Sequence, residues 1–205
     1  MSDDTSGMIL GAAILVVLIP ALYFLARFVT KIGDAWNARL LAPLAPAIGG
    51  TVHRSGPHID GTYENHALRV SFAGRTSVGS GESATSINAF YIEVLHLPGH
   101  ENWRIKFYAP GLLRQGPNEP FIEAEAALGD RLKRAGVLEA VSKVSAPTQC
   151  YVTVAYDARR QVLTYTDDVS PRWLPSPQAF AMQLALTARL AAINAQVNPV
   201  ASARG

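Results

Sequence analysis

The segment between Asp4 and Arg27 constrains this chain most, because it contains no charged residue. As a helix, its 22 positions would extend over about 33 Å, whereas the hydrocarbon core of a bilayer is about 30 Å thick. We therefore predict a short N-terminal tail over residues 1–7 and a transmembrane helix over residues 8–30. The residues that mark this predicted membrane anchor are Met8, Leu18, Pro20 and Ala26.

Two other interpretations of this segment fit it less well. A cleaved signal peptide has a basic start and an apolar run of about 7–15 residues, whereas this chain starts with Asp3 and Asp4 and has a longer run. The only cysteine is Cys150, so a lipoprotein cleavage site is excluded. A core helix of a globular protein would also be apolar on all sides, but this segment lies close to the N-terminus and is largely aliphatic. Pro20 is compatible with a span, since its freed carbonyl can be satisfied locally in lipid.

The charges that flank the segment predict its orientation. Two aspartates precede it, whereas Arg27, Lys31 and Arg39 follow it with only Asp34 to oppose them. Lys and Arg near a span favour the cytoplasmic side of the membrane. We therefore predict a single-pass protein of the cell membrane whose soluble domain lies in the cytoplasm.

Residues 31–50 are predicted to form an amphipathic stalk and a Pro/Gly linker. Apolar residues recur mostly at spacings of three and four across the end of the span and the stalk, which indicates one face of a helix. These residues are Leu25, Phe28, Val29, Ile32, Trp36 and Leu40. We expect this face to lie on the lipid headgroups or to pack against the domain. Pro43 and Pro46 end the helix by about Leu41, and Gly49-Gly50 leads into the domain.

Residues 51–199 have the length of one ordinary domain, and residues 200–205 are predicted to be a disordered tail. The formal net charge of +2 is too small to indicate nucleic-acid binding. A single cysteine excludes a disulfide framework and a Cys-rich zinc site. We expect no cofactor.

From Thr51 the apolar pattern changes to a period of two, which is typical of strands. The predicted order is several strands, a broken helix over Ala127–Lys143, a second hairpin, and a long helix over Pro177–Val197. We expect the Gly/Ser-rich segment Gly74–Ser86 to be a flexible connection. Its G-x-G-x-x-A match indicates a hairpin loop, because a dinucleotide site needs a helix after the glycines. The fold class is therefore α+β, an antiparallel sheet with helices on one face.

All five histidines lie between positions 53 and 100, in the strand-rich part of the chain. They are His53, His58, His66, His96 and His100. Such clustering is the only hint of a metal site, but none of the five stands in a ligand motif, so solvated histidines are the simpler interpretation. Scattered glutamates show no pairing that would predict general acid–base catalysis, and the sequence nominates no catalytic residue.

Basic side chains on the polar faces of two predicted strands are candidates for contact with anionic lipid. They are Arg69, Arg104 and Lys106. Close to a membrane each would contribute about 1 kcal/mol. The simpler alternative is a solvated sheet face.

Several short motifs carry a resemblance. An apolar span is followed by Leu44-Ala-Pro-Ala-Ile-Gly-Gly50, the strand Gly61-Thr62-Tyr63, a short basic strand, a hairpin and a helix. In this order the chain resembles uncharacterised bacterial membrane-anchored proteins with a C-terminal α+β domain. The resemblance implies a bacterial inner-membrane setting and this architecture. It implies no activity and no site residues.

These observations favour a non-catalytic protein that binds the lipid bilayer through its anchor and a membrane-protein partner through its domain, for example as an accessory subunit. The alternative is a membrane-tethered enzyme, or a metal- or ligand-binding domain that uses the histidine-rich strands. A third hypothesis is a homo-oligomer that associates through Gly7 and Gly11, which form a G-x-x-x-G pair.

Overall fold

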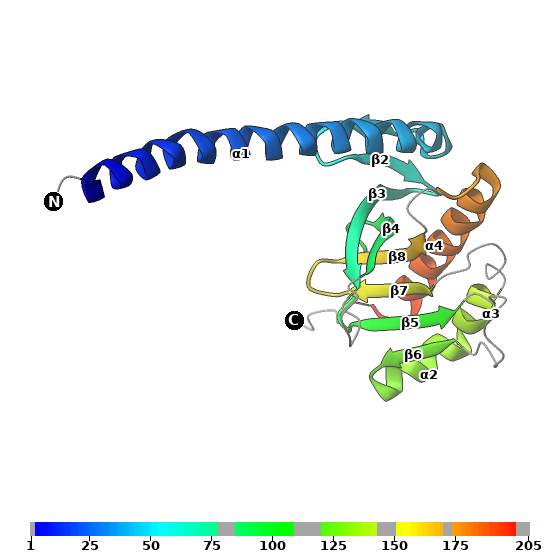
Figure 1. Ribbon diagram of the computed structural model, residues 1–205. Helices are drawn as coiled ribbons and strands as arrows, with labels where there is room; N and C mark the ends of the chain where they lie inside the picture. Colours follow the sequence, from blue (N-terminus) through cyan, green and yellow to red (C-terminus); the bar gives the residue numbers. More distant parts are fainter. Residues whose placement is uncertain (1–2, 78–84, 109–119, 143–150, 170–173, 200–205) are drawn as a thin grey trace, which may run out of the picture.

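The computed structural model describes residues 3–77, 85–108, 120–142, 151–169 and 174–199 (Figure 1). Only the backbone is described at residues 3–17, 74–77, 85–88, 108, 151 and 168–169. In chain order the elements are α1 Asp3–Leu41, η1 Ala42–Ile48, β1 Thr51–His53, β2 His58–Tyr63, β3 His66–Ser77, β4 Thr85–Val94, β5 Trp103–Tyr108, β6 Phe121–Ala124, α2 Ala126–Arg134, α3 Val137–Ser142, β7 Tyr151–Asp157, β8 Val162–Val169 and α4 Pro177–Val197.

The strands of the described ranges form one sheet in the order β1-β2-β3-β4-β8-β7-β5-β6. Every neighbouring pair is antiparallel. The tight turn between β2 and β3 has positive φ at both Glu64 and Asn65, as a two-residue hairpin of this twist requires. The prediction of an α+β fold built on an antiparallel sheet is confirmed.

One face of the sheet carries the core. Cross-strand partners in a row across the sheet are all buried or partly buried on this face, namely Val70, Ile92, Tyr165, Val154, Ile105 and Ile122. Helix α4 contacts β4 and β8, and α2 contacts both α4 and β6. The ring of Phe90 meets that of Phe180 edge to face at 5.9 Å. Alternate side chains of each strand therefore lie on the opposite, open face.

Helix α4 begins and ends where the sequence predicts. The Ser176 hydroxyl accepts a hydrogen bond from the Ala179 N–H at 3.2 Å, and Pro177 occupies the first turn. The predicted core stripe is buried throughout, at Phe180, Leu184, Leu186, Leu190 and Ile193. Asn198 and Pro199 follow the last turn, as the sequence indicates.

Helix α1 projects away from the domain (Figure 1). From Leu18 onward its large apolar side chains are half exposed or more, at Leu18, Ile19, Leu22, Tyr23, Phe24, Leu25, Phe28, Val29, Ile32 and Trp36. Burial against the domain begins only at Ala38 and Leu41. The amphipathic face therefore does not pack against the domain before its last turn. Within the described residues, no helix is both long and apolar enough to cross a membrane.

The segment expected to be a Pro/Gly linker after Leu41 instead forms η1, and its Leu44, Ala45 and Ile48 join the core. A short 3-10 helix tolerates the two prolines because it needs few backbone donors. Gly61 on β2 makes this packing possible. A Cβ there would lie 2.5 Å from the Ile48 carbonyl oxygen, so only glycine lets η1 approach the strand this closely.

One prediction about a connection needs correction. Within Gly74–Ser86, expected to be a flexible connection, β3 continues to Ser77 and β4 starts at Thr85, with Gly74 paired to Asn88. The ladder continues because it needs only backbone groups. The G-x-G-x-x-A match, at residues 79–84, lies outside the described residues. The broken helix predicted over Ala127–Lys143 is confirmed, since it divides into α2 and α3 at Gly136, whose φ is +81°.

Candidate functional site

The open face of the sheet carries a row of charged and polar side chains. One row across it runs through Asp60, Arg69, Glu93, Thr164, Ala155, Arg104 and Glu123. In this row opposite charges face each other across the strands, which is the arrangement that stabilises cross-strand pairs. The three basic residues nominated for lipid contact all lie on this face.

Each of these three basic residues has an acidic partner. Arg69 Nε donates to Asp60 Oδ1 at 2.9 Å. Arg104 Nη1 lies 3.6 Å from Glu123 Oε2, and Lys106 Nζ donates to Oε1 of the same carboxylate. Most of the positive charge is therefore balanced locally, which reduces the attraction that anionic lipid would exert. Lipid contact at these positions stays a prediction.

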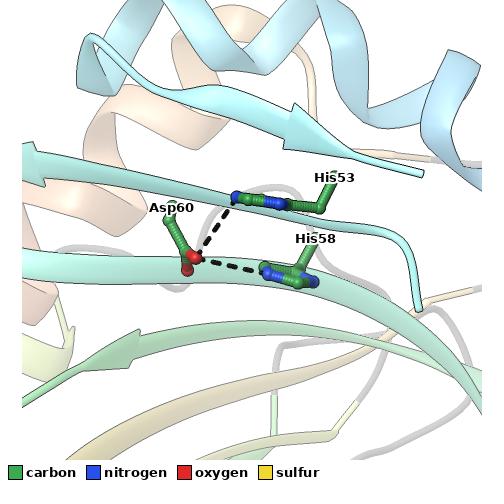
Figure 2. A group of neighbouring side chains, drawn as sticks. All are labelled: His53, His58 and Asp60. Carbon is green, nitrogen blue, oxygen red and sulfur yellow. Dashed lines mark ion pairs between the residues drawn. The ribbon is translucent and has the colours of Figure 1, made fainter. Parts of the chain in front are cut away.

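Two of the five histidines come together with a carboxylate (Figure 2). His53 Nε2 lies 3.4 Å from Asp60 Oδ2, and His58 Nε2 lies 3.3 Å from the same oxygen. One ligand-type atom of each residue lies within 4.8 Å of the other two. The imidazole rings stack, with centroids 4.4 Å apart and planes at 11°. We name these three residues the His–Asp cluster.

The other three histidines lie elsewhere. His66 starts β3, and His96 follows β4 with a positive φ of 57°. His100 belongs to the polar network described below. The five histidines therefore do not share one site, although the sequence nominated them together. Asp60 was not among the candidates from the sequence. The spacing His58-x-Asp60 could have indicated it, because this spacing places both side chains on one face of a strand.

The groups around Asp60 favour its ionised form. The hydrogen bond from Arg69 lowers the pKa of Asp60, partial burial opposes it, and the charges of Arg69, His58 and His53 lower it further. The same hydrogen bond raises the pKa of Arg69. His58 is fixed from its other side, since its Nδ1 lies 2.6 Å from the Gly56 carbonyl oxygen.

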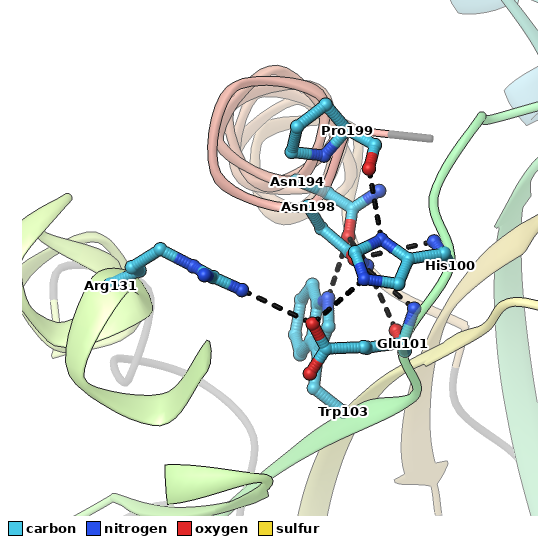
Figure 3. A network of polar contacts seen from close by, with 7 residues as sticks. All are labelled: His100, Glu101, Trp103, Arg131, Asn194, Asn198 and Pro199. Atoms are coloured by element: carbon cyan, nitrogen blue, oxygen red, sulfur yellow. Dashed lines mark hydrogen bonds and ion pairs between the residues drawn. The ribbon is translucent and has the colours of Figure 1, made fainter. Parts of the chain in front are cut away.

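A second polar network joins the C-terminal end of α4 to the segment before β5 (Figure 3). Trp103 Nε1 donates to Asn194 Oδ1 at 2.7 Å, and Asn194 Nδ2 donates to the Pro98 carbonyl at 3.1 Å. Asn198 donates from Nδ2 to the Glu101 carbonyl at 2.8 Å and accepts the Glu101 N–H at 3.1 Å. These bonds satisfy the buried indole N–H of Trp103 and several part-buried backbone groups, so the network is structural.

His100 and Arg131 extend this network at its edge. His100 Nδ1 lies 2.9 Å from the Pro199 carbonyl oxygen, so it acts as the donor there, and Nε2 lies 3.0 Å from Glu101 Oε1. Arg131 Nη2 of α2 reaches the same carboxylate oxygen at 3.2 Å. Glu101 therefore ties α2 to the segment before β5. The contacts of Glu101 with His100 and Arg131 do not resemble a catalytic acid–base pair that faces a substrate.

Two shallow depressions open near the turn between β7 and β8. One of about 440 Å³ is lined by Arg104, Glu123, Arg160 and Thr164, among others. The other, of about 580 Å³, is lined by His100, Asn102 and Arg159, among others. Around them, ion pairs join Arg104 to Glu123, Arg160 to Glu93 and His100 to Glu101, and the Asp157 carboxylate accepts a backbone N–H of its turn. These contacts do not form a nucleophile–base arrangement. The His–Asp cluster lies outside both depressions.

Comparison with protein-family models, with curated proteins and with solved structures found no significant match to this chain. The resemblance to bacterial membrane-anchored proteins therefore stays an expectation from the sequence.

Proposed function

We propose that this chain is a single-pass protein of the bacterial inner membrane that presents its sheet domain at the cytoplasmic surface. There the domain would bind a protein partner, as a non-catalytic accessory subunit of a membrane assembly. The observation that carries the proposal is α1. It continues without interruption from the uncharged N-terminal run to Leu41, and its apolar side chains from Leu18 to Trp36 are exposed.

Exposed apolar area of this kind is unfavourable in water, at about 25 cal/mol per Å². From Leu18 to Leu25 these side chains surround the helix rather than form one stripe, and a helix that is apolar all round is typical of a membrane environment or of a protein interior. Arg27, Lys31 and Arg39 follow the run, and such positive flanks support a cytoplasmic domain. The packing of Ala38, Leu41 and η1 would hold the domain close to the bilayer.

The open face of the sheet supports binding rather than catalysis. Its acidic and basic groups pair with one another, and the depressions beside them are shallow and polar. The edge strand β6 also exposes Phe121, whose side chain is 62% accessible. Since β6 is the outermost strand of the described sheet, an exposed aromatic residue there supports a protein-binding surface, in which aromatic residues are enriched.

Photo-crosslinking in native membranes tests the partner directly. A photo-reactive residue would be placed at Phe121 of the full chain, with Gln196 on the exposed side of α4 as the control position. We expect a discrete adduct from position 121, of a mass different from the chain's own dimer, and no such adduct from position 196. A dimer adduct alone would contradict an accessory role and favour the homo-oligomer.

A reporter at the C-terminal Gly205 tests the orientation. A fluorescent protein that matures only in the cytoplasm should give signal, whereas a phosphatase that is active only outside should stay inactive. The reverse pattern would place the domain on the outer side of the membrane.

A further inference from the structure

The His–Asp cluster is fixed by strand register. His53 pairs directly with His58 across the β1–β2 hairpin, so both side chains lie on the same face of the sheet. Asp60 follows His58 by two residues and therefore shares that face, opposite Arg69 of β3. Three potential ligands thus come from two adjacent strands, without contribution from a loop tip.

The hydrogen bonding of His58 determines which ring nitrogen is available. The Gly56 carbonyl oxygen can only accept, so Nδ1, at 2.6 Å, carries the proton. In the neutral ring Nε2 then presents a lone pair, and it lies 3.3 Å from Asp60 Oδ2. His53 Nε2 lies 3.4 Å from the same oxygen. At His58, a lone pair that faces a carboxylate is unfavourable without a cation between the two, whereas the neutral ring of His53 can meet the carboxylate with an Nε2–H.

The two nitrogen–oxygen spacings fit a metal ion. Ligand atoms about 2.0–2.1 Å from a tetrahedral zinc ion lie about 3.3 Å apart, and the two nitrogen–oxygen distances in the cluster are 3.3 and 3.4 Å. Two imidazoles and one carboxylate are a donor set that suits zinc and related first-row metals. The hydrogen bonds that orient these ligands are also typical of a metal site. The Gly56 carbonyl holds His58, and Arg69 Nε holds the second carboxylate oxygen of Asp60, Oδ1, at 2.9 Å.

We propose that His53, His58 and Asp60 form a binding site for a divalent transition-metal ion, with zinc as the ion of choice. Oδ2 of Asp60 and the two Nε2 atoms would be the ligands, and the fourth position would hold water. The side chains of His53 and Asp60 are 48% and 38% exposed, so solvent reaches this position.

Binding requires one local change. The rings are stacked nearly parallel, so their lone pairs converge only if one ring turns out of the stack. His53 is the ring that turns, because it is the more exposed and His58 is held by Gly56. The ion also replaces the longer of the two Arg69 contacts, that of Nη2 with Oδ2 at 3.3 Å.

The test is a zinc titration of the full chain in detergent, without a polyhistidine tag and after metal removal, in competition with a chromophoric chelator. We expect one zinc ion per chain. The variants H53Q, H58Q and D60N should each weaken binding by at least about tenfold. The control H66Q, on β3 and outside the cluster, should bind zinc as the unaltered chain does.

Two further measurements separate lost ligation from lost folding. Circular dichroism should show all variants folded. Zinc should raise the unfolding temperature of the unaltered chain and of H66Q, but not that of H58Q. With Co²⁺ in place of Zn²⁺, visible absorption typical of tetrahedral coordination should appear and should be lost in H58Q. The proposal is overturned if the unaltered chain binds no zinc stoichiometrically, or if H53Q and H58Q bind it unchanged. In either case the cluster is a set of polar contacts around the Asp60 carboxylate and no metal site.

Discussion

The indole Nε1 of Trp103 donates a 2.7 Å hydrogen bond to Oδ1 of Asn194, and this bond joins the start of β5 to the buried side of α4. Both side chains are buried, and Asn194 also binds the Pro98 carbonyl and receives a bond from Asn198. Asn194 therefore binds polar groups of three other residues at once.

Replacement of Asn194 by leucine should destabilise the domain. It leaves the buried Trp103 N–H unsatisfied, at about 1–3 kcal/mol, and the part-buried Pro98 carbonyl loses a hydrogen bond as well. We expect a loss of about 2–4 kcal/mol in the free energy of unfolding, measured with urea. The control Gln196→Ala, at an exposed position of the same helix, should change it by less than about 0.5 kcal/mol. Equal effects at both positions would contradict a special role for Asn194.

Glycine substitutions on β2 and α1 should act in opposite directions. Gly61→Ala would place a methyl group 2.5 Å from the Ile48 carbonyl oxygen, so η1 and β2 must separate, at about 1–3 kcal/mol. Gly33→Ala on α1 meets no described atom within 4 Å and should stabilise that helix by about 0.5–1 kcal/mol. Urea unfolding and helical circular dichroism measure the two effects. A neutral Gly61→Ala would show that η1 does not pack on the strand this closely.

The buried Tyr165 should make the domain less stable at high pH. Burial, followed by the nearby Asp167 carboxylate, raises its pKa well above the usual value of 10. Above pH 10 the unfolded chain loses this proton while the folded chain keeps it, so stability falls with rising pH by up to about 1.4 kcal/mol per pH unit. Urea unfolding at pH 8, 10 and 11 should show a steeper decline for the unaltered chain than for Tyr165→Phe. Parallel declines would mean that Tyr165 ionises as readily in the folded state.

The G-x-x-x-G pair provides a prediction about self-association. Gly7 and Gly11 lie at the edge of the proposed span, where close helix approach buries little area. We expect the double variant Gly7→Leu with Gly11→Leu to leave the oligomeric state in detergent unchanged, as measured by light scattering. A dimer that becomes a monomer in the variant would establish the homo-oligomer.

The strands and helices with regular apolar spacing were predictable from the sequence. In β5, Trp103, Ile105 and Phe107 alternate with polar residues, and in α4 proline starts the helix and an Asn-Pro pair ends it. The extension of β3 through Gly74 was not predictable, because backbone hydrogen bonds continue a ladder whatever the side chains indicate.

The candidate site was only partly predictable. A hairpin brings His53 and His58 together at short range, so their proximity could be inferred from the turn between them. The pairing of Arg104 and Lys106 with Glu123 depends on the register of β5 with β6, which the sequence does not determine. The bond between His100 and Pro199 joins residues 99 positions apart, and no local pattern predicts such a contact.

Membrane extraction tests the central claim of a retained anchor most directly. The full chain would be expressed in bacteria, and the membranes would be washed with alkaline carbonate, which releases peripheral proteins. Two arginines near the centre of the span, Leu15→Arg with Leu18→Arg, should release the chain, because each costs about 2.5–3.5 kcal/mol in lipid. The matched control, Ile32→Arg with Trp36→Arg beyond the span, should stay in the pellet. We predict that the unaltered chain stays in the membrane pellet, and its recovery in the carbonate supernatant would contradict the account.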